Sequence, residues 1–175
     1  MAIGNDSHAH NTYANAGSGW PITSISCSLV HSASVLVIAR IYSDGGNPTG
    51  VTCGGIVMTE DMALRTTFGR VYVLYRTSSG TETVTTTIPN SNVVGLLVDA
   101  HTGTVTSAPF LECQTINNTG IPVTVPTGTT GRRIIHYITL NGYGCGFTKG
   151  ASQTEIDAAT SNDSYSGGGG EGGGG

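Results

Sequence analysis

Hydrophobic and polar residues alternate with a period of two over several short segments of the chain. In residues 22–30, Ile25, Cys27 and Leu29 alternate with serines, a pattern typical of a half-buried β-strand. Residues 34–42 form a nearly continuous apolar run instead, which predicts a central strand. The run ends at the turn-forming sequence Asp-Gly-Gly-Asn-Pro of residues 44–48.

The same reasoning predicts further short strands, separated by turn signals and without intervening helices. Gly54 and Gly55 lie inside one of them and indicate a bulge or a close backbone approach. This spacing favours an all-β fold, an antiparallel two-sheet sandwich of jelly-roll type. The additional expected strands are 51–58, 69–76, 81–88, 92–100, 111–116, 121–125, 132–140 and 145–149.

The alternation also predicts which side chains face the core. The threonines at positions 81, 83, 85 and 87 share one face of their strand, and the strand at 69–76 has apolar residues on both faces. We expect a core that includes Ile25, Leu29, Val35, Val37, Ile56, Val73, Val84, Val94, Leu96, Ile135 and Ile138.

Three regions are predicted: an N-terminal arm over 1–19, a β-sandwich over 20–160, and a glycine-rich tail over 161–175. The arm is small and polar without periodicity. The tail has eight glycines around Glu171 and, taken alone, resembles a flexible linker.

Composition narrows the class of protein. Only 10% of residues are charged, against about 25% in ordinary domains, and Gly, Ser and Thr make up 69 of 175. This excludes charge-driven disorder and coiled coils. The net charge of −4 gives no basic surface for nucleic acid, and no apolar run reaches the ~18 residues of a membrane helix. The first residues do not resemble a signal peptide, so synthesis in a cytoplasm is expected.

The chain has four cysteines, and no two of them have the spacing of a CxxC motif: Cys27, Cys53, Cys113 and Cys145. Zinc-ribbon and thioredoxin-type sites therefore lack their spacing. Three of the four lie in apolar strand patterns, so we expect mostly buried free thiols, with one or two disulfides as the alternative.

The sequence predicts no catalytic residue, metal or cofactor. No Gly-x-Ser-x-Gly elbow occurs, although Asp99 and His101 flank Ala100 and could point to one face. His8 and His10, with Asp6 nearby, lack the further ligands of a zinc site. The loop from Asp44 to Asn47 lacks the acidic ladder of a calcium site.

Five sequence blocks between about residues 22 and 160 resemble a jelly-roll sandwich domain of tailed-phage virion proteins. The blocks are VLVIA at 35–39, VTCGGIVMT at 51–59, VYVLYR at 71–76, SGTETVT at 79–85 and VVGLLV at 93–98. The resemblance implies a sandwich used in assembly or attachment, and it carries no catalytic residues.

We therefore predict a structural virion protein on the outer surface of the particle, most of all a capsid decoration (cement) protein. Its partners would be the major capsid protein or other virion subunits, with a homo-oligomer (trimer or dimer) on the particle. The alternative is a tail-fibre or receptor-binding module contacting host glycans through loops such as 43–50 and 101–109. An enzyme is the weakest class, because Glu60 and Asp61 would face opposite ways on a strand.

The arms are expected to dock this protein onto its assembly. Neither arm has enough apolar surface to offset the entropy lost on ordering, which is about 1–2 kcal/mol per residue. The predicted anchors are Ile3, Tyr13 and Trp20 in the N-terminal arm, and Tyr165 and Glu171 in the tail.

Overall fold

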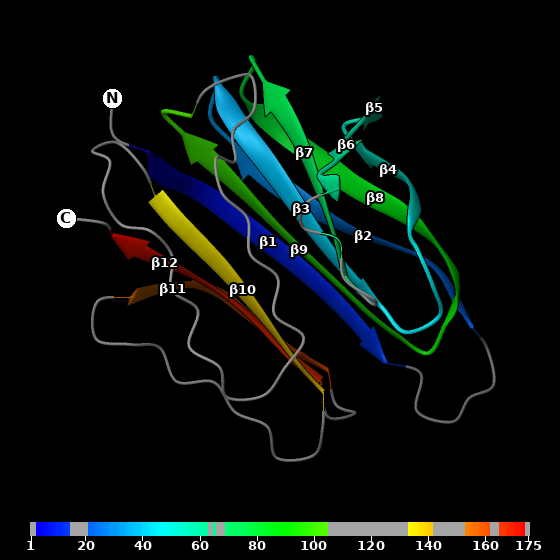
Figure 1. Cartoon of the computed structure of the whole chain (residues 1–175). Helices are drawn as coiled ribbons and strands as arrows, with labels where there is room; N and C mark the ends of the chain where they lie inside the picture. The colour runs from blue at the N-terminus through cyan, green and yellow to red at the C-terminus, as the bar shows by residue number, and fades with distance from the viewer. Residues whose placement is uncertain are drawn as a thin grey trace.

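The computed structural model is an all-β fold in which two antiparallel sheets pack face to face (Figure 1). It describes residues 3–14, 21–62, 65, 69–104, 133–141, 153–161 and 165–173. Side chains are described only up to Thr104, and those of Tyr13 and Ala14 are not. The elements that the structure describes are all strands, β1 to β12. The prediction of an antiparallel β-sandwich is therefore confirmed.

The sandwich has a five-stranded and a four-stranded sheet. The first has the order β1 (Gly4–Ala14), β9 (Val93–Thr102), β3 (Val35–Ser43), β7 (Gly69–Arg76) and β6 (Thr59–Glu60). The second has the order β2 (Ile22–His31), β8 (Gly80–Ser91), β4 (Thr49–Cys53) and β5 (Ile56–Val57). β3 lies between β9 and β7, which confirms its predicted central place.

The core lies between these sheets. Leu29 and Val84 from the four-stranded sheet meet Val35, Val37 and Leu96 from the five-stranded sheet, and all five are fully buried. A second cluster, Leu36, Ile38 and Val71, lies on the opposite face of β3 and β7. β3 and β7 therefore carry apolar side chains on both faces, as their patterns predicted.

A third, three-stranded sheet has the order β10 (Arg133–Asn141), β12 (Tyr165–Gly173) and β11 (Gln153–Ser161). Of this sheet, β11 contacts β1. The expected strand at 132–140 is present as β10. The expected strands at 111–116, 121–125 and 145–149 lie outside the described residues.

The prediction of an N-terminal arm was wrong over residues 4–14. These residues form β1, whose register with β9 runs from Gly4 opposite Thr102 to Ala14 opposite Val93. An edge strand is held by backbone hydrogen bonds, so a polar segment can pair without a hydrophobic period. The glycine-rich tail, which taken alone resembled a flexible linker, contains a strand, β12, that is paired on both sides with β10 and β11.

One predicted core residue, Ile56, is 45% exposed. Gly54 and Gly55 have φ values of 56° and 79° and form the two-residue turn between β4 and β5. Two successive positive φ values are what a tight hairpin of this length requires. The turn places Ile56 on a two-residue edge strand, where a neighbouring strand is missing. Of the other predicted core residues, Val73 is half-buried, and the structure does not describe the side chains of Ile135 and Ile138.

Candidate functional site

The outer face of the four-stranded sheet carries a regular array of hydroxyl groups. Across β2 and β8 the pairs are Ser24 with Thr87, Ser26 with Thr85, and Ser28 with Thr83. Thr52 of β4 pairs with Thr85 on the other side. We call this surface the hydroxyl face; its members are Ser24, Ser26, Ser28, Thr52, Thr81, Thr83, Thr85 and Thr87.

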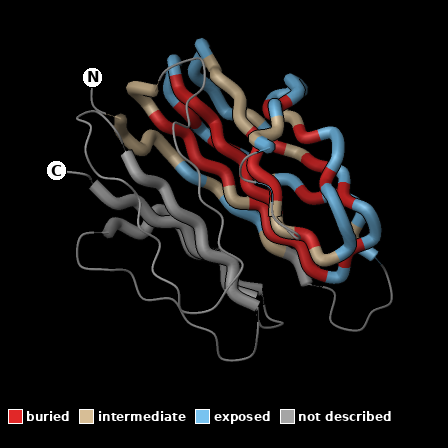
Figure 2. The backbone as a smooth tube through the Cα atoms, viewed as in Figure 1, coloured by how far each residue is buried: buried red, intermediate tan, exposed pale blue. Residues whose placement is uncertain are grey.

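The alternating sequence of β8 produces this face. Val84, Thr86 and Ile88 point inward and are buried, so the threonines between them point outward. Figure 2 shows buried and exposed positions alternating along the strands of this sheet. The sequence pattern predicted that these threonines share one face, and the structure adds the serines and Thr52 beside them.

No charged side chain lies on the hydroxyl face among the described strands. Its hydroxyls form no hydrogen bond with another described group, so their donors and acceptors are available to a partner. Two large apolar side chains flank it: Val30, opposite Thr81, is 64% exposed, and Val57, opposite Thr52, is 71% exposed. An exposed sheet face without charges differs from most protein surfaces, which mix both signs of charge.

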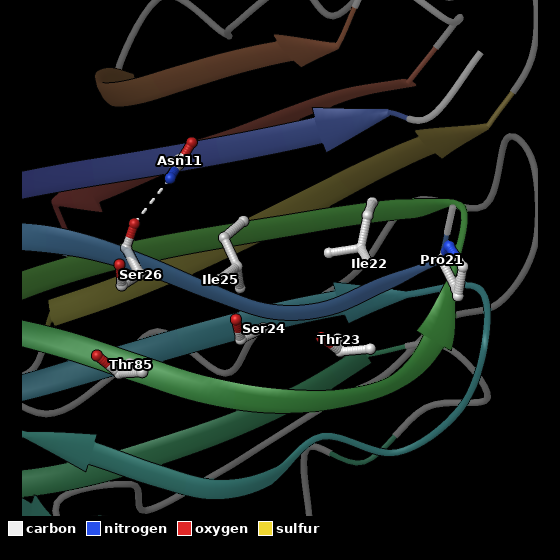
Figure 3. Close-up of a pocket in the computed structure, with 8 residues that line it drawn as sticks. All are labelled: Asn11, Pro21, Ile22, Thr23, Ser24, Ile25, Ser26 and Thr85. Atoms are coloured by element: carbon white, nitrogen blue, oxygen red, sulfur yellow. Dashed lines mark hydrogen bonds between the residues drawn. The ribbon is translucent and has the colours of Figure 1, made fainter. Parts of the chain in front are cut away.

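A groove of about 410 Å³ adjoins this face along the edge of β2 (Figure 3). Ile22 and Ile25 extend from β2 on the side of β1. The hydroxyls of Ser24 and Thr85 lie on the other side of the strand. The groove is lined by Asn11, Pro21, Ile22, Thr23, Ser24, Ile25, Ser26 and Thr85.

Side chains of β1 cover part of the free edge of β2. The Asn11 Nδ2 group donates to the Ser26 carbonyl at 2.7 Å, and the Ser32 amide donates to Asp6 Oδ2 at 2.6 Å. Unpaired edge groups invite pairing with other chains, and polar caps reduce that risk. β1 therefore closes one side of the sandwich as well as extending its own sheet.

At one end of the sandwich, Glu82 is the centre of a largely buried polar cluster. Its Oε1 accepts a hydrogen bond from Arg76 Nη2, and its Oε2 accepts one from Cys53 Sγ at 3.1 Å. His31 Nε2 lies 3.3 Å from the same Oε2, while His31 Nδ1 donates to the Ser32 carbonyl at 2.8 Å.

The cluster shifts two pKa values in opposite directions. Burial raises the pKa of Glu82. The hydrogen bonds that its carboxylate accepts from Arg76, Cys53 and His31 lower the pKa by more, so it stays below its usual range. Burial, followed by the bond to Glu82, raises the pKa of Cys53 to about 12. Cys53 is therefore an unreactive thiol at neutral pH.

Neither Cys27 nor Cys53 forms a disulfide, as predicted for the cysteines in strands; Cys53 is buried and Cys27 is half-buried. Each is in register with Val84, one from β2 and one from β4. Two strand spacings separate their backbones by roughly 9–10 Å, beyond the ~7 Å limit of a disulfide. Cys113 and Cys145 lie outside the described residues.

Asp99 and His101 do point to one face, as their spacing suggested. His101 Nε2 lies 3.5 Å from Asp99 Oδ2, and Arg40 Nη2 donates to the same oxygen. Burial alone would raise the pKa of Asp99, but the charge of Arg40 and hydrogen bonds from His101 and Arg40 lower it to about 2. All three side chains are buried. The Arg40–Asp99 ion pair is therefore internal, and it links β3 to β9.

Metal-ligating side chains do not gather in the described part of the chain: no group of three His, Cys, Asp or Glu residues is arranged to hold an ion. His8 and His10 are exposed on β1. A search of the described residues for a helix able to cross a membrane found none.

Four of the five predicted anchor residues lie in the described part of the chain. Ile3 precedes β1 and is half-buried, and Tyr13 lies in β1 opposite Val94. Trp20 lies outside the described residues. Tyr165 and Glu171 are in β12, opposite Asn141 and Ile135 of β10. Their role in partner binding stays a prediction.

Comparisons with family models, with curated proteins and with solved structures found no match to this chain.

Proposed function

We propose that this protein is a structural component of the outer surface of a tailed-phage virion, in the manner of a capsid decoration protein with a jelly-roll sandwich. The observation that carries the proposal is the uncharged, exposed hydroxyl face. Interface centres are depleted in charged residues, whereas free protein surfaces are not. A rigid sheet that presents such a face is suited to lie against other subunits.

The sequence resemblance supports the same function. Its five blocks fall on β3, the β4–β5 hairpin with the following segment, β7, β8 and β9, which together build most of both sheets. A structural protein on a shell is present in many copies, and avidity offsets weak individual contacts.

The docking surface that we propose is on the sandwich and not on the N-terminal arm. Because β1 is paired along its length with β9, residues 4–14 are already committed to the sandwich. The hydroxyl face, with Val30 and Val57 at its rim, is a described surface that offers both apolar contacts and hydrogen bonds.

Phage particles purified by density gradient from a lysate of the phage that encodes this chain test the proposal. The chain should cosediment with them in a fixed ratio to the major capsid protein, and surface biotinylation of intact particles should label it. Purified particles without the chain would refute the proposal.

The groove favours a second candidate function, a receptor-binding module for host glycans. Its volume falls in the range of about 300–1,000 Å³ that is usual for ligand pockets. Ile22 and Pro21 offer apolar contact, while Ser24, Ser26 and Thr85 offer hydroxyls. A glycan would then bind along β2, and not at the loops that the sequence suggested.

A further inference from the structure

We infer that the hydroxyl face is the docking surface for a second copy of this chain, packed sheet against sheet. The inference rests on the proposed assembly function and names one of its partners. The residues that carry it are Ser26, Thr85 and Thr52, which form the middle row of the face, and Val57 at the end of that row.

The absence of charged side chains on the hydroxyl face limits which partner it can bind. The face presents no charged side chain, so neither an acidic nor a basic surface would gain ion pairs on it. A hydroxyl both donates and accepts hydrogen bonds, so an array of hydroxyls is complementary to itself. A two-fold pairing places the same patch on both partners, and self-complementarity is the property that such pairing needs.

The apolar groups on the face support the same partner. Val30 and Val57 stand at opposite margins, on β2 and β5, and are among the most exposed large apolar side chains of the described residues. In a face-to-face pair at the usual ~10 Å sheet spacing, these valines can reach the other copy and exclude water from the hydroxyls between them. The face also lacks the lysines that commonly guard exposed sheets.

The size of the face sets the strength of the pair. Four strands about 4.8 Å apart and seven residues at about 3.4 Å cover roughly 300–400 Å², about half of the ~800 Å² per partner in a stable complex. A pair held by this face alone should therefore be weak, like the transient contacts at the small end of interface sizes. Many copies on one shell would make such contacts sufficient.

Sedimentation equilibrium of the full chain tests the inference. We expect a reversible dimer, and we expect Thr85→Lys to weaken it at least tenfold because two like charges would meet at the centre of the interface. Thr59→Lys is the matched control, because Thr59 is exposed on β6 in the other sheet. The dimerisation constant of this variant should equal that of the original chain.

Charge reversal distinguishes an interface from damage to the fold. Thr85→Lys and Thr85→Glu should each be monomeric, and an equimolar mixture of the two should form the heterodimer. A full chain that stays monomeric to about 1 mM, or a Thr85→Lys variant that dimerises like the original, would overturn the inference. Binding of the monomeric chain to soluble dextran, lost in Thr85→Lys, would also overturn it and assign the face to a neutral glycan.

Failure of this inference can be told apart from failure of the proposed function. If the chain cosediments with particles while the Thr85→Lys variant incorporates at the same ratio, the structural role stands and only the self-docking surface is wrong.

Discussion

Arg76 at the end of β7 and Glu82 near the start of β8 form an ion pair that joins the two sheets of the sandwich. The pair is largely buried, and Glu82 also binds Cys53 of β4 and contacts His31 of β2. One carboxylate therefore connects four strands at the same end of the core.

Arg76→Gln should destabilise the fold by about 2 kcal/mol, because it leaves the Glu82 carboxylate largely buried without its main counter-charge. The matched control is Arg65→Gln, since Arg65 also pairs with a glutamate, Glu60, but is 40% exposed whereas Arg76 is 15% exposed. Exposed pairs contribute less than about 1 kcal/mol. Urea unfolding of the two variants measures the difference, and equal losses would contradict the structural role of the Arg76–Glu82 pair.

Stability should fall in acid between about pH 4 and pH 2. The folded-state pKa of Asp99 lies near 2, below the ordinary value of 3.8, so its contribution is complete above the ordinary value and is lost as pH falls through the folded value. The loss amounts to about 2 kcal/mol, and Glu82 changes stability in the same direction. Urea unfolding at pH 7, 4, 3 and 2 gives the profile. An unfolding free energy at pH 2 equal to that at pH 7 would show that Asp99 is not paired as described.

Gly54→Ala should cost more stability than Gly55→Ala. Both residues have positive φ, which costs other residues roughly 1–2 kcal/mol. A Cβ on Gly54 would also lie 2.9 Å from Glu82 Cδ, whereas a Cβ on Gly55 would meet nothing within 4 Å. The extra loss for Gly54→Ala should be about 1 kcal/mol, because Glu82 must move away from its partners.

Thermal and urea unfolding of the two glycine variants measure this order, with Gly80→Ala as the control. Gly80 has no positive φ and open space around it, so alanine there should change stability little. The same loss at positions 54 and 55 would mean that Glu82 does not lie over the hairpin.

Deleting residues 1–14 should destabilise the sandwich and promote aggregation. The deletion exposes the paired edge of β9 and removes the caps that Asn11 and Asp6 place on β2. Free edges of this kind associate with other chains. Urea unfolding with light scattering measures both effects against the full chain. A truncated chain with an unchanged unfolding midpoint and no added scattering would show that the sandwich does not depend on β1.

Most strand positions between residues 22 and 100 were predictable because the longer strands there bury one or both faces. The single strand expected at 51–58 was wrong, because Gly54 and Gly55 form a turn that divides it into β4 and β5. β7 has the predicted bounds, and β2, β3 and β9 differ from their predicted bounds by one or two residues. β1 was not predictable in the same way, since Asn5, His8 and Asn11 show no apolar period and the strand depends on the backbone of β9. Ile56 was misplaced because alternation fixes the side of a strand but not whether another strand covers it.

Only part of the candidate site could be predicted from the sequence. The threonine alternation of β8 showed one row of the hydroxyl face. Its second and third rows, with Ser26 and Thr52, depend on which strands lie beside β8, and strand order is a long-range property. The cluster around Glu82 depends on the same order, since His31, Cys53 and Arg76 come from three different strands. Nothing in the local sequence of any one strand indicates it.

Cryo-electron microscopy of purified particles tests the central claim most directly, because it shows what the hydroxyl face contacts. The account predicts copies of this sandwich on the outer surface, with the face formed by β2, β8 and β4 turned toward a neighbouring subunit and Thr85 inside the contact. Copies whose hydroxyl face is turned to solvent, with contacts made elsewhere on the chain, would contradict it.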